Sequence, residues 1–263
     1  MDEERPLSIN FFEEYLTEEN LERLSYIKHK STVFIACKNV EEFEIQKDLL
    51  QKRHPHITIG YWPIIGDSYW ISPFSPTREL KRLKRELAHI MSSTPILIDL
   101  ELPLNILSYI RNILLFWHHK RLLRQIKELA TSRNLNIYYC ERASGNKLFL
   151  SALRLLGVSF DPKTHDGKIL IMYYTSVIEK RSGKKGRRKI SNMIRNIARD
   201  YPERLTVGLG TTATGEMGNE PKLSAKSLAR DLRFSKKAGI KEVFIFRLGG
   251  HDSKYQDVIE EFL

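Results

Sequence analysis

The feature that most constrains the fold of this chain is the alternation of short apolar runs with amphipathic segments along almost its whole length. The runs are rich in β-branched and aromatic residues, and apolar residues recur at helical spacing in most of the segments between them. The eight runs are STVFIACK, HITIGYWPI, PILIDLELP, LNIYYCER, GVSFD, KILIMYYTS, LTVGLGTT and KEVFIFRLGG. Buried strands that alternate with helices indicate a parallel sheet covered by helices. Eight such units within 263 residues predict a (β/α)₈ barrel, with an open doubly wound sheet as the alternative.

Two segments depart from this pattern. A helix is expected over residues 8–28, before the first run. Only PKTHDG separates GVSFD, at 157–161, from KILIMYYTS, at 168–176, and this spacer is too short for a crossover helix. Either the barrel lacks a helix between its fifth and sixth strands, or GVSFD is not a strand. We expect a helical extension over residues 1–30 and one barrel domain over residues 31–263, because no Gly/Ser-rich or Pro-rich linker divides the chain.

Composition narrows the class of protein. The N-terminal segment is acidic and amphipathic, without the basic and apolar regions of a secretory signal, so we expect a cytoplasmic protein. Cys37 and Cys140 lie in apolar runs without the spacing of metal ligands, and we expect both to be reduced core residues. We expect no metal site, since the adjacent His118 and His119 cannot share one helical face. We also expect no cofactor. The abundance of Lys, Arg, Glu and Ile is typical of proteins from thermophiles.

The most apolar segment of the chain follows the third run. Arg111 and Asn112 interrupt it well short of the roughly 20 apolar residues that cross a bilayer, so we do not expect it to span a membrane. Apolar residues recur there at helical spacing. We expect residues 104–117 to form a helix wedged between neighbouring helices, with a homo-oligomer interface or a membrane-touching surface as the alternatives.

Two carboxylates stand at the end of the third run, ILIDLE. Asp99 and Glu101 are two residues apart, so on a strand their side chains face the same side, roughly 7 Å apart. In barrels the C-terminal ends of the strands carry the active site. A carboxylate inside an apolar barrel requires proton sharing, a basic partner or a ligand. The pair therefore predicts acid/base chemistry, and the alternative is that one acid pairs with an internal Lys or Arg or caps the next helix.

Aromatic residues lie at the ends of neighbouring runs. Sugar faces stack on aromatic rings, while acids accept hydrogen bonds from hydroxyls and protonate a leaving oxygen. Pro and Gly within YWPIIGDSYWISPF break any regular element, which predicts a binding loop after the second strand. The expected substrate-binding residues are Tyr61, Trp62, Trp70, Tyr173, Tyr174 and Arg247. Each of the aromatic residues, taken alone, is more often a packing residue.

These features resemble the (β/α)₈ glycoside-hydrolase-like superfamily. In its chitinase-like and lysozyme-like muramidase families a strand ending in D-x-E carries the catalytic acids, and ILIDLE resembles that strand. YWP after the second strand and MYYTS at the sixth extend the likeness. The full D-x-x-D-x-D-x-E motif of chitinases is absent, since the matching window is STPILIDLE, and so is the D-x-S of the muramidases. The resemblance implies hydrolysis of a glycosidic bond, with Glu101 as general acid, Asp99 as its partner and Glu141 as a second candidate acid.

Glycine-rich turns after the last two strands favour a different enzyme class. Barrels often bind phosphate at this place, because glycines let backbone N–H groups approach the anion. The candidate phosphate-binding residues are Gly208, Gly210, Gly249 and Gly250. They make a phosphosugar or phosphodiester enzyme the alternative prediction.

The positive charge of the chain is concentrated in one segment. Residues 180–189, KRSGKKGRRK, supply seven of the charges that make up a net charge of +11, and we expect them to form a loop after the sixth strand. Such a loop is typically solvated and mobile, but Lys184, Lys185, Arg187 and Arg188 are suited to an acidic glycan or an anionic polymer or membrane surface. The third hypothesis is therefore a non-catalytic barrel that binds nucleic acid or an anionic membrane.

Overall fold

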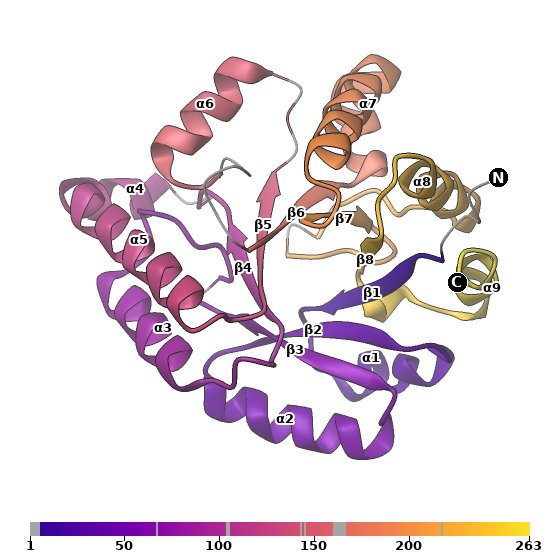
Figure 1. The fold of residues 1–263 in the computed structure, drawn as a ribbon, viewed down its shortest axis with the longest axis horizontal. Coiled ribbons are helices and arrows are strands. Elements are labelled where there is room, and N and C mark those ends of the chain that lie inside the picture. Colours follow the sequence, from indigo (N-terminus) through magenta and orange to yellow (C-terminus); the bar gives the residue numbers. More distant parts are fainter. Residues whose placement is uncertain are drawn as a thin grey trace.

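The chain folds into a closed barrel of eight parallel strands arranged in sequence order, surrounded by helices (Figure 1). The computed structural model describes residues 6–66, 68–103, 106–142, 144, 146–159, 167–216 and 218–263. The strands are β1 (Ser8–Glu13), β2 (Ser31–Cys37), β3 (Ile57–Pro63), β4 (Ile96–Leu100), β5 (Ile137–Arg142), β6 (Lys168–Tyr173), β7 (Leu205–Gly210) and β8 (Glu242–Phe246). Pairing of β1 with both β2 and β8 closes the ring, which confirms the predicted (β/α)₈ barrel.

The helices cover the outside of this ring (Figure 1). They are α1 (Glu18–Glu22), α2 (Val40–Arg53), α3 (Thr77–His89), α4 (Ile106–Asn112), α5 (Phe116–Ser132), α6 (Lys147–Leu156), α7 (Thr175–Asp200), α8 (Ala225–Lys237) and α9 (Ser253–Glu260), with short 3₁₀ turns η1 (Arg23–Tyr26), η2 (Ile113–Leu115) and η4 (Leu248–Gly250). Polar side chains cap several of them: Asn39, Ser224 and Asp252 each accept a hydrogen bond from a backbone N–H of the first turn.

The prediction of a helix over residues 8–28 is wrong for its first part. Residues 8–13, SINFFE, form β1, which is buried at all positions but Ser8 and pairs on both sides. Helical structure is confined to α1 and η1. Glu13 and Glu14 give the segment an amphipathic pattern, but both acids come at the end of a six-residue strand. Residues 8–13 therefore belong to the barrel and not to a helical extension over residues 1–30.

The predicted strand GVSFD, residues 157–161, is also wrong where the structure describes it. Gly157 has φ of 77° and ends α6 in the left-handed conformation, and Val158 and Ser159 are not in a strand. Residues 160–161 lie outside the described residues. Because α6 supplies the crossover from β5 to β6, no helix is missing there, and β1 completes the set of eight strands.

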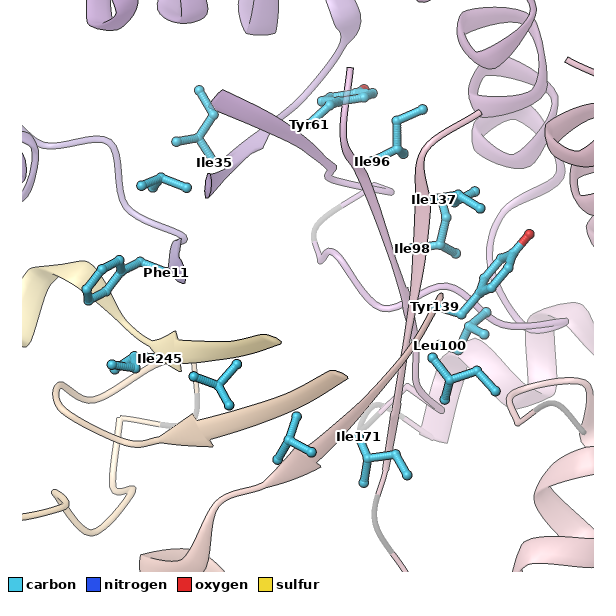
Figure 2. Close-up of a cluster of buried hydrophobic side chains, with 14 of the residues drawn as sticks. Phe11, Ile35, Tyr61, Ile96, Ile98, Leu100, Ile137, Tyr139, Ile171 and Ile245 are labelled. Atoms are coloured by element: carbon cyan, nitrogen blue, oxygen red, sulfur yellow. The ribbon is translucent and has the colours of Figure 1, made fainter. Parts of the chain in front are cut away.

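Alternation along each strand separates an outer core from an inner one. Ile96, Ile98 and Leu100 of β4 belong to the outer cluster between the sheet and the helices (Figure 2). The inner cluster fills the barrel, where the ring centroids of Phe12 and Phe244 lie 5.2 Å apart. Both faces of the strands are buried, as expected for parallel barrel strands.

The N-terminal end of the barrel is closed by a polar group of three side chains. Nζ of Lys168 donates to Oε2 of Glu242 at 2.7 Å and to the hydroxyl of Tyr138 at 2.8 Å. The Tyr138 hydroxyl in turn donates to Oε1 of Glu242 at 3.0 Å. Since these partners satisfy one another, this end serves stability, and any open site lies at the C-terminal end.

The apolar segment after β4 lies on the surface. Residues 106–117 form α4, η2 and the start of α5, while residues 104–105 lie outside the described part of the chain. Ile110, Ile113 and Leu114 are exposed, so the expectation of a helix wedged between neighbours is wrong. Within the described residues, no helix has the length and apolar character needed to cross a membrane.

Candidate active site

A cavity of about 230 Å³ opens at the C-terminal ends of the strands. Side chains from β1, β3, β4, β5, β6 and β8, and from the loops and helix α7 that follow, form its walls. The polar and aromatic members are Phe12, Trp62, Tyr69, Trp70, Asp99, Glu101, Cys140, Arg142, Tyr174, Arg181, Ser182, Thr211, Glu216, Glu220 and Phe246. The predicted pair Asp99 and Glu101 is therefore brought together in one cavity at the predicted end of the barrel.

Asp99 is the most deeply buried acid of the cavity, with 4% of its surface exposed. Burial raises the pKa of this carboxyl well above its usual value, and the neighbouring charge of Glu101 raises it further. A hydrogen bond from the Cys140 thiol lowers the pKa only in part. Oδ1 of Asp99 has no hydrogen-bond partner among the described residues. This acid is thus poorly satisfied by the protein itself.

Glu101 follows β4 by one residue and lies nearer the mouth of the cavity. Burial of its carboxyl raises its pKa, the guanidinium charges of Arg142 and Arg181 lower it, and Glu216 raises it. The charge of Glu101 raises the pKa of Asp99, so the two carboxyl groups titrate as a pair. The pair therefore keeps a proton at higher pH than isolated acids do and can donate it.

Aromatic rings form one wall of the cavity. The centroids of Trp62 and Tyr69 lie 4.3 Å apart, and those of Tyr69 and Trp70 lie 5.8 Å apart at 78°. Nε1 of Trp62 is buried and has no hydrogen-bond partner within the described part of the chain. The wall therefore combines apolar ring faces with an unpaired donor.

Tyr174 stands on another side of the cavity, stacked on Phe246 with centroids 5.5 Å apart. Gly208 and Gly210 of β7 are tightly packed, since a Cβ would lie 3.2 Å from Cδ2 of Leu170 at Gly208 and 2.8 Å from the Phe246 carbonyl oxygen at Gly210. Both glycines are buried strand residues and not exposed turns that wrap an anion.

Three of the predicted site residues lie outside the cavity because they face the helices. Tyr61 donates a hydrogen bond to Oε2 of Glu86 in α3 at 2.9 Å, and it points away from the barrel interior (Figure 2). Tyr173 shares a hydrogen bond of 2.6 Å with Ser191 of α7. Oε2 of Glu141 accepts one from Ser159 at 2.7 Å. Their sequence neighbours Trp62, Tyr174 and Arg142 line the cavity instead.

Arg247 is a structural residue and not a member of the cavity wall. Its Nη1 pairs with Oε1 of Glu13 at 2.6 Å, and its Nε donates to the carbonyl of Thr214 at 2.9 Å. The N–H of Gly249 donates to the other oxygen of Glu13 at 2.6 Å. A Cβ on Gly250 would lie 2.3 Å from the Thr212 carbonyl oxygen. A carboxylate and tight packing occupy this turn, so the geometry argues against the predicted phosphate site.

The acids at the end of β1, Glu13 and Glu14, were not predicted as site residues, whereas Tyr69, the partner of Glu14, lies in the predicted binding loop. The Tyr69 hydroxyl donates to Oε2 of Glu14 at 2.7 Å, while Oε1 of Glu14 is buried without a hydrogen-bond partner among the described residues. Burial raises the pKa of Glu14 to about 7. The sequence contains a signal for these acids, because an acid directly follows the apolar run INFF just as an acid follows ILI. The segment that holds INFF was instead predicted to be a helix.

The basic segment 180–189 is helical and not a loop. It lies within α7, which is interrupted at Gly183 with φ of 59°. A groove of about 560 Å³ between α7 and α8 is lined by Lys184, Lys185, Arg187, Arg188, Arg195 and Arg230, among others. Arg187 and Arg230 both pair with Glu179, at 2.8 and 3.5 Å. This groove is separate from the acid-lined cavity.

Metal ligands do not gather at the site. Within the described ranges, no three His, Cys, Asp or Glu side chains are placed to hold a metal ion. His119 is buried and bonded, with Nε2 2.6 Å from the Thr77 hydroxyl and Nδ1 2.9 Å from the Pro73 carbonyl oxygen. Both cysteines are buried and form no disulfide, as predicted, and Cys140 lies in the cavity wall.

No known family model matches the chain, and no curated protein matches it. Solved structures of similar fold match almost its whole length. The PgaB (BpsB) glycoside hydrolase domain from Bordetella bronchiseptica matches with a TM-score of 0.59 at 12% identity, covering 97% of this chain and 99% of that one. A chitinase from Chromobacterium violaceum gives 0.55 at 10% identity, with 97% and 98% covered. D-psicose 3-epimerase from Clostridium cellulolyticum gives 0.53 at 11% identity, again with 97% and 98% covered. The chain thus has the (β/α)₈ fold of these structures, several of which are named as glycoside hydrolases or chitinases.

Proposed function

We propose that this protein is a glycoside-hydrolase-like enzyme that cleaves a glycosidic bond in the cavity formed around Asp99 and Glu101. One observation carries the proposal: two buried polar atoms of the cavity wall, Oδ1 of Asp99 and Nε1 of Trp62, have no hydrogen-bond partner among the described residues. Buried polar groups in native proteins are normally satisfied, and exceptions mark functional sites. A sugar hydroxyl both donates and accepts, so one ligand class satisfies both atoms.

The aromatic wall supports the same ligand class. Trp62, Tyr69 and Trp70 offer ring faces beside the two acids, and apolar sugar faces stack on such rings. Several of the similar solved structures are named as glycoside hydrolases or chitinases, which is consistent with a carbohydrate substrate.

The chemistry follows from the protonation of the acid pair. Glu101 donates its proton to the glycosidic oxygen as the bond from that oxygen to the anomeric carbon breaks, and water supplies the new hydroxyl and restores the proton. Arg142 and Arg181 stabilise the carboxylate that Glu101 becomes. Asp99, with its raised pKa, holds a proton in the cavity and orients Glu101 or a polar group of the substrate.

The test replaces each acid and measures release of reducing ends from a panel of oligosaccharides. We expect Glu101→Gln to lower kcat by about 10² to 10⁴, the usual contribution of a general acid. Glu141→Gln is the matched control, because Glu141 occupies the next strand but faces the helices. Full activity of Glu101→Gln, equal losses in both variants, or no turnover of any oligosaccharide by the wild-type protein would each contradict the proposal.

A second function is favoured by the basic groove between α7 and α8. Its cluster of cations is suited to an anionic polymer such as an acidic glycan, held with an affinity that falls as salt rises. Replacing Lys184, Lys185 and Arg188 together by Gln should weaken retention on an immobilised polyanion. Replacement of the exposed Lys52 and Arg53 of α2 by Gln is the control and should have a smaller effect. Equal retention of all three proteins would show that the groove binds no such polymer.

A further inference from the structure

One sector of the surface carries most of the exposed apolar side chains. Of the 15 large hydrophobic residues that are exposed in the described part of the chain, nine lie between residues 107 and 155. Leu114 is 94% exposed, Leu148 82% and Trp117 73%. We call this surface the apolar rim and define it by Ile110, Ile113, Leu114, Leu115, Trp117, Leu148, Phe149 and Leu155. Soluble proteins seldom expose such a cluster unless it binds something.

The rim is continuous across two neighbouring helical segments on the cavity side of the barrel. Nζ of Lys120 in α5 donates to the carbonyl of Leu155 in α6 at 2.6 Å, and it lies 5.3 Å from the centroid of the Trp117 ring. The helices α4 and α6 follow the C-terminal ends of β4 and β5, and Figure 1 shows them on the same sector of the ring. The rim therefore lies on the sector of the ring that follows β4 and β5, two strands that contribute residues to the cavity wall.

The charge around the rim has one sign. The sequence holds no Asp or Glu from residue 102 to 127 or from residue 142 to 157. Arg111, Arg121, Arg124 and Arg154 are exposed within these stretches. Exposed Leu, Ile and Trp bordered by Arg and Lys is the composition of protein surfaces that lie in the interface of an anionic bilayer.

Other occupants fit this surface less well. A second copy of the chain, related by a twofold axis, would bring the same arginines against themselves without acids to offset them. A carbohydrate would stack on aromatic rings, but most of the rim is aliphatic. From the composition and the charge we infer that the apolar rim docks on the surface of an anionic phospholipid bilayer, with its aliphatic and Trp side chains at the headgroup level. This inference does not depend on which bond the enzyme cleaves.

The docking is peripheral and depends on both the apolar side chains and the positive charges of the rim. A few apolar side chains alone give weak, reversible attachment, so the arginines must supply part of the affinity. Binding should therefore require anionic lipid and weaken as salt screens the charges.

The test is flotation of the purified protein with vesicles of phosphatidylcholine, with or without about a third of phosphatidylglycerol. We expect the wild-type protein to float with the anionic vesicles at low salt and not with the neutral ones. Leu114→Glu and Trp117→Glu should each lower the affinity roughly tenfold or more, since a carboxylate enters the interface. Ile45→Glu, on the exposed face of α2 and 68% exposed, is the matched control and should float like the wild type.

Melting temperatures should be the same for all four proteins, because every substituted side chain is exposed. The inference is overturned if the wild type does not float, or if Leu114→Glu floats equally well. It is also overturned if only the basic-groove variant at Lys184, Lys185 and Arg188 loses binding. A lipid-independent dimer that Leu114→Glu dissociates, without vesicle binding by the wild type, would assign the rim to a second copy instead.

Discussion

Two acids at the C-terminal ends of barrel strands, Glu13 on β1 and Asp99 on β4, are both buried but differently partnered. Glu13 accepts hydrogen bonds from the N–H groups of Tyr15 and Gly249 at 2.8 and 2.6 Å, and it pairs with Arg247 at 2.6 Å. Asp99 has the Cys140 thiol, a like charge at Glu101 and an oxygen without a partner among the described residues. Burial alone therefore does not separate a structural acid from a reactive one, but the set of donors around it does.

The different partners of Glu13 and Asp99 change how ionisation of each acid affects the stability of the fold. Burial raises the pKa of both acids, and at Glu13 the charge of Arg247 and the backbone hydrogen bonds lower it in part. A carboxyl that keeps a raised pKa without such donors destabilises the fold when it ionises. Buried groups that destabilise the fold in this way are concentrated at functional sites in native proteins.

The largest effect is expected where the partnered acid loses its cation. Arg247→Met leaves the Glu13 carboxylate buried without its ion pair, which should lower the free energy of unfolding by about 3 to 5 kcal/mol at neutral pH. The loss should shrink as pH falls below 4.5, because the Glu13 carboxyl then takes up a proton and no longer needs the cation. Denaturant unfolding in both pH ranges measures it.

Arg142→Met is the control for this variant. Arg142 acts on Glu101 but is exposed, so its removal should change the stability by less than about 1 kcal/mol. Equal losses of stability in the two arginine variants would contradict the claim that the ion pair at the end of β1 stabilises the fold while Arg142 at the end of β5 does not.

A smaller effect on the free energy of unfolding is expected at Glu14, which lies between the surroundings of Glu13 and those of Asp99. Its folded-state pKa of about 7 stands above its ordinary value of 4.5, so the folded protein binds this proton more tightly than the unfolded chain. The wild-type stability contributed by the group is therefore full below pH 4.5 and falls as pH rises to 7. Glu14→Gln should remove that decline, which amounts to on the order of 3 kcal/mol. Parallel stability profiles of the two proteins from pH 4 to 8 would contradict this assignment.

The smallest effect is expected for the unpaired indole. Trp62→Phe keeps an aromatic ring in the wall but removes Nε1–H, so affinity for the oligosaccharide should fall about tenfold, or ~1.4 kcal/mol. Stability should not decrease, because no hydrogen bond within the described protein is lost. Trp117→Phe, outside the cavity, should leave affinity unchanged. Calorimetric titration decides the point, and an unchanged affinity of Trp62→Phe would remove the indole from the binding site.

The barrel was predictable because its strands leave a strong pattern. Seven of the eight runs became strands, and the exception was the short run GVSFD. The six-residue β1 escaped detection because two acids follow its apolar residues and imitate the polar face of a helix. Strand identity at such a length depends on pairing with β2 and β8, which no local signal encodes.

The acid pair was predictable from spacing, whereas the aromatic residues were not. Asp99 and Glu101 had to share one face because they are two residues apart. Adjacent pairs such as Tyr61–Trp62 and Tyr173–Tyr174 place one ring on each face, and a strand buried on both faces gives no alternation to show which ring turns inward. The partnership of Arg247 with Glu13 joins residues more than 200 positions apart and follows only from barrel closure.

Whether Asp99 is an uncompensated acid kept for its chemistry can be measured with Asp99→Asn. Its free energy of unfolding is compared with that of the wild type from pH 4 to 8, with activity measured in parallel. The raised folded-state pKa of Asp99 means that wild-type stability falls as pH rises above the ordinary value of an Asp carboxyl. We expect Asp99→Asn to be inactive, to match the wild type in stability near pH 4 and to be more stable than the wild type at pH 8. A variant that is less stable at pH 8, or one that keeps full activity, would contradict it.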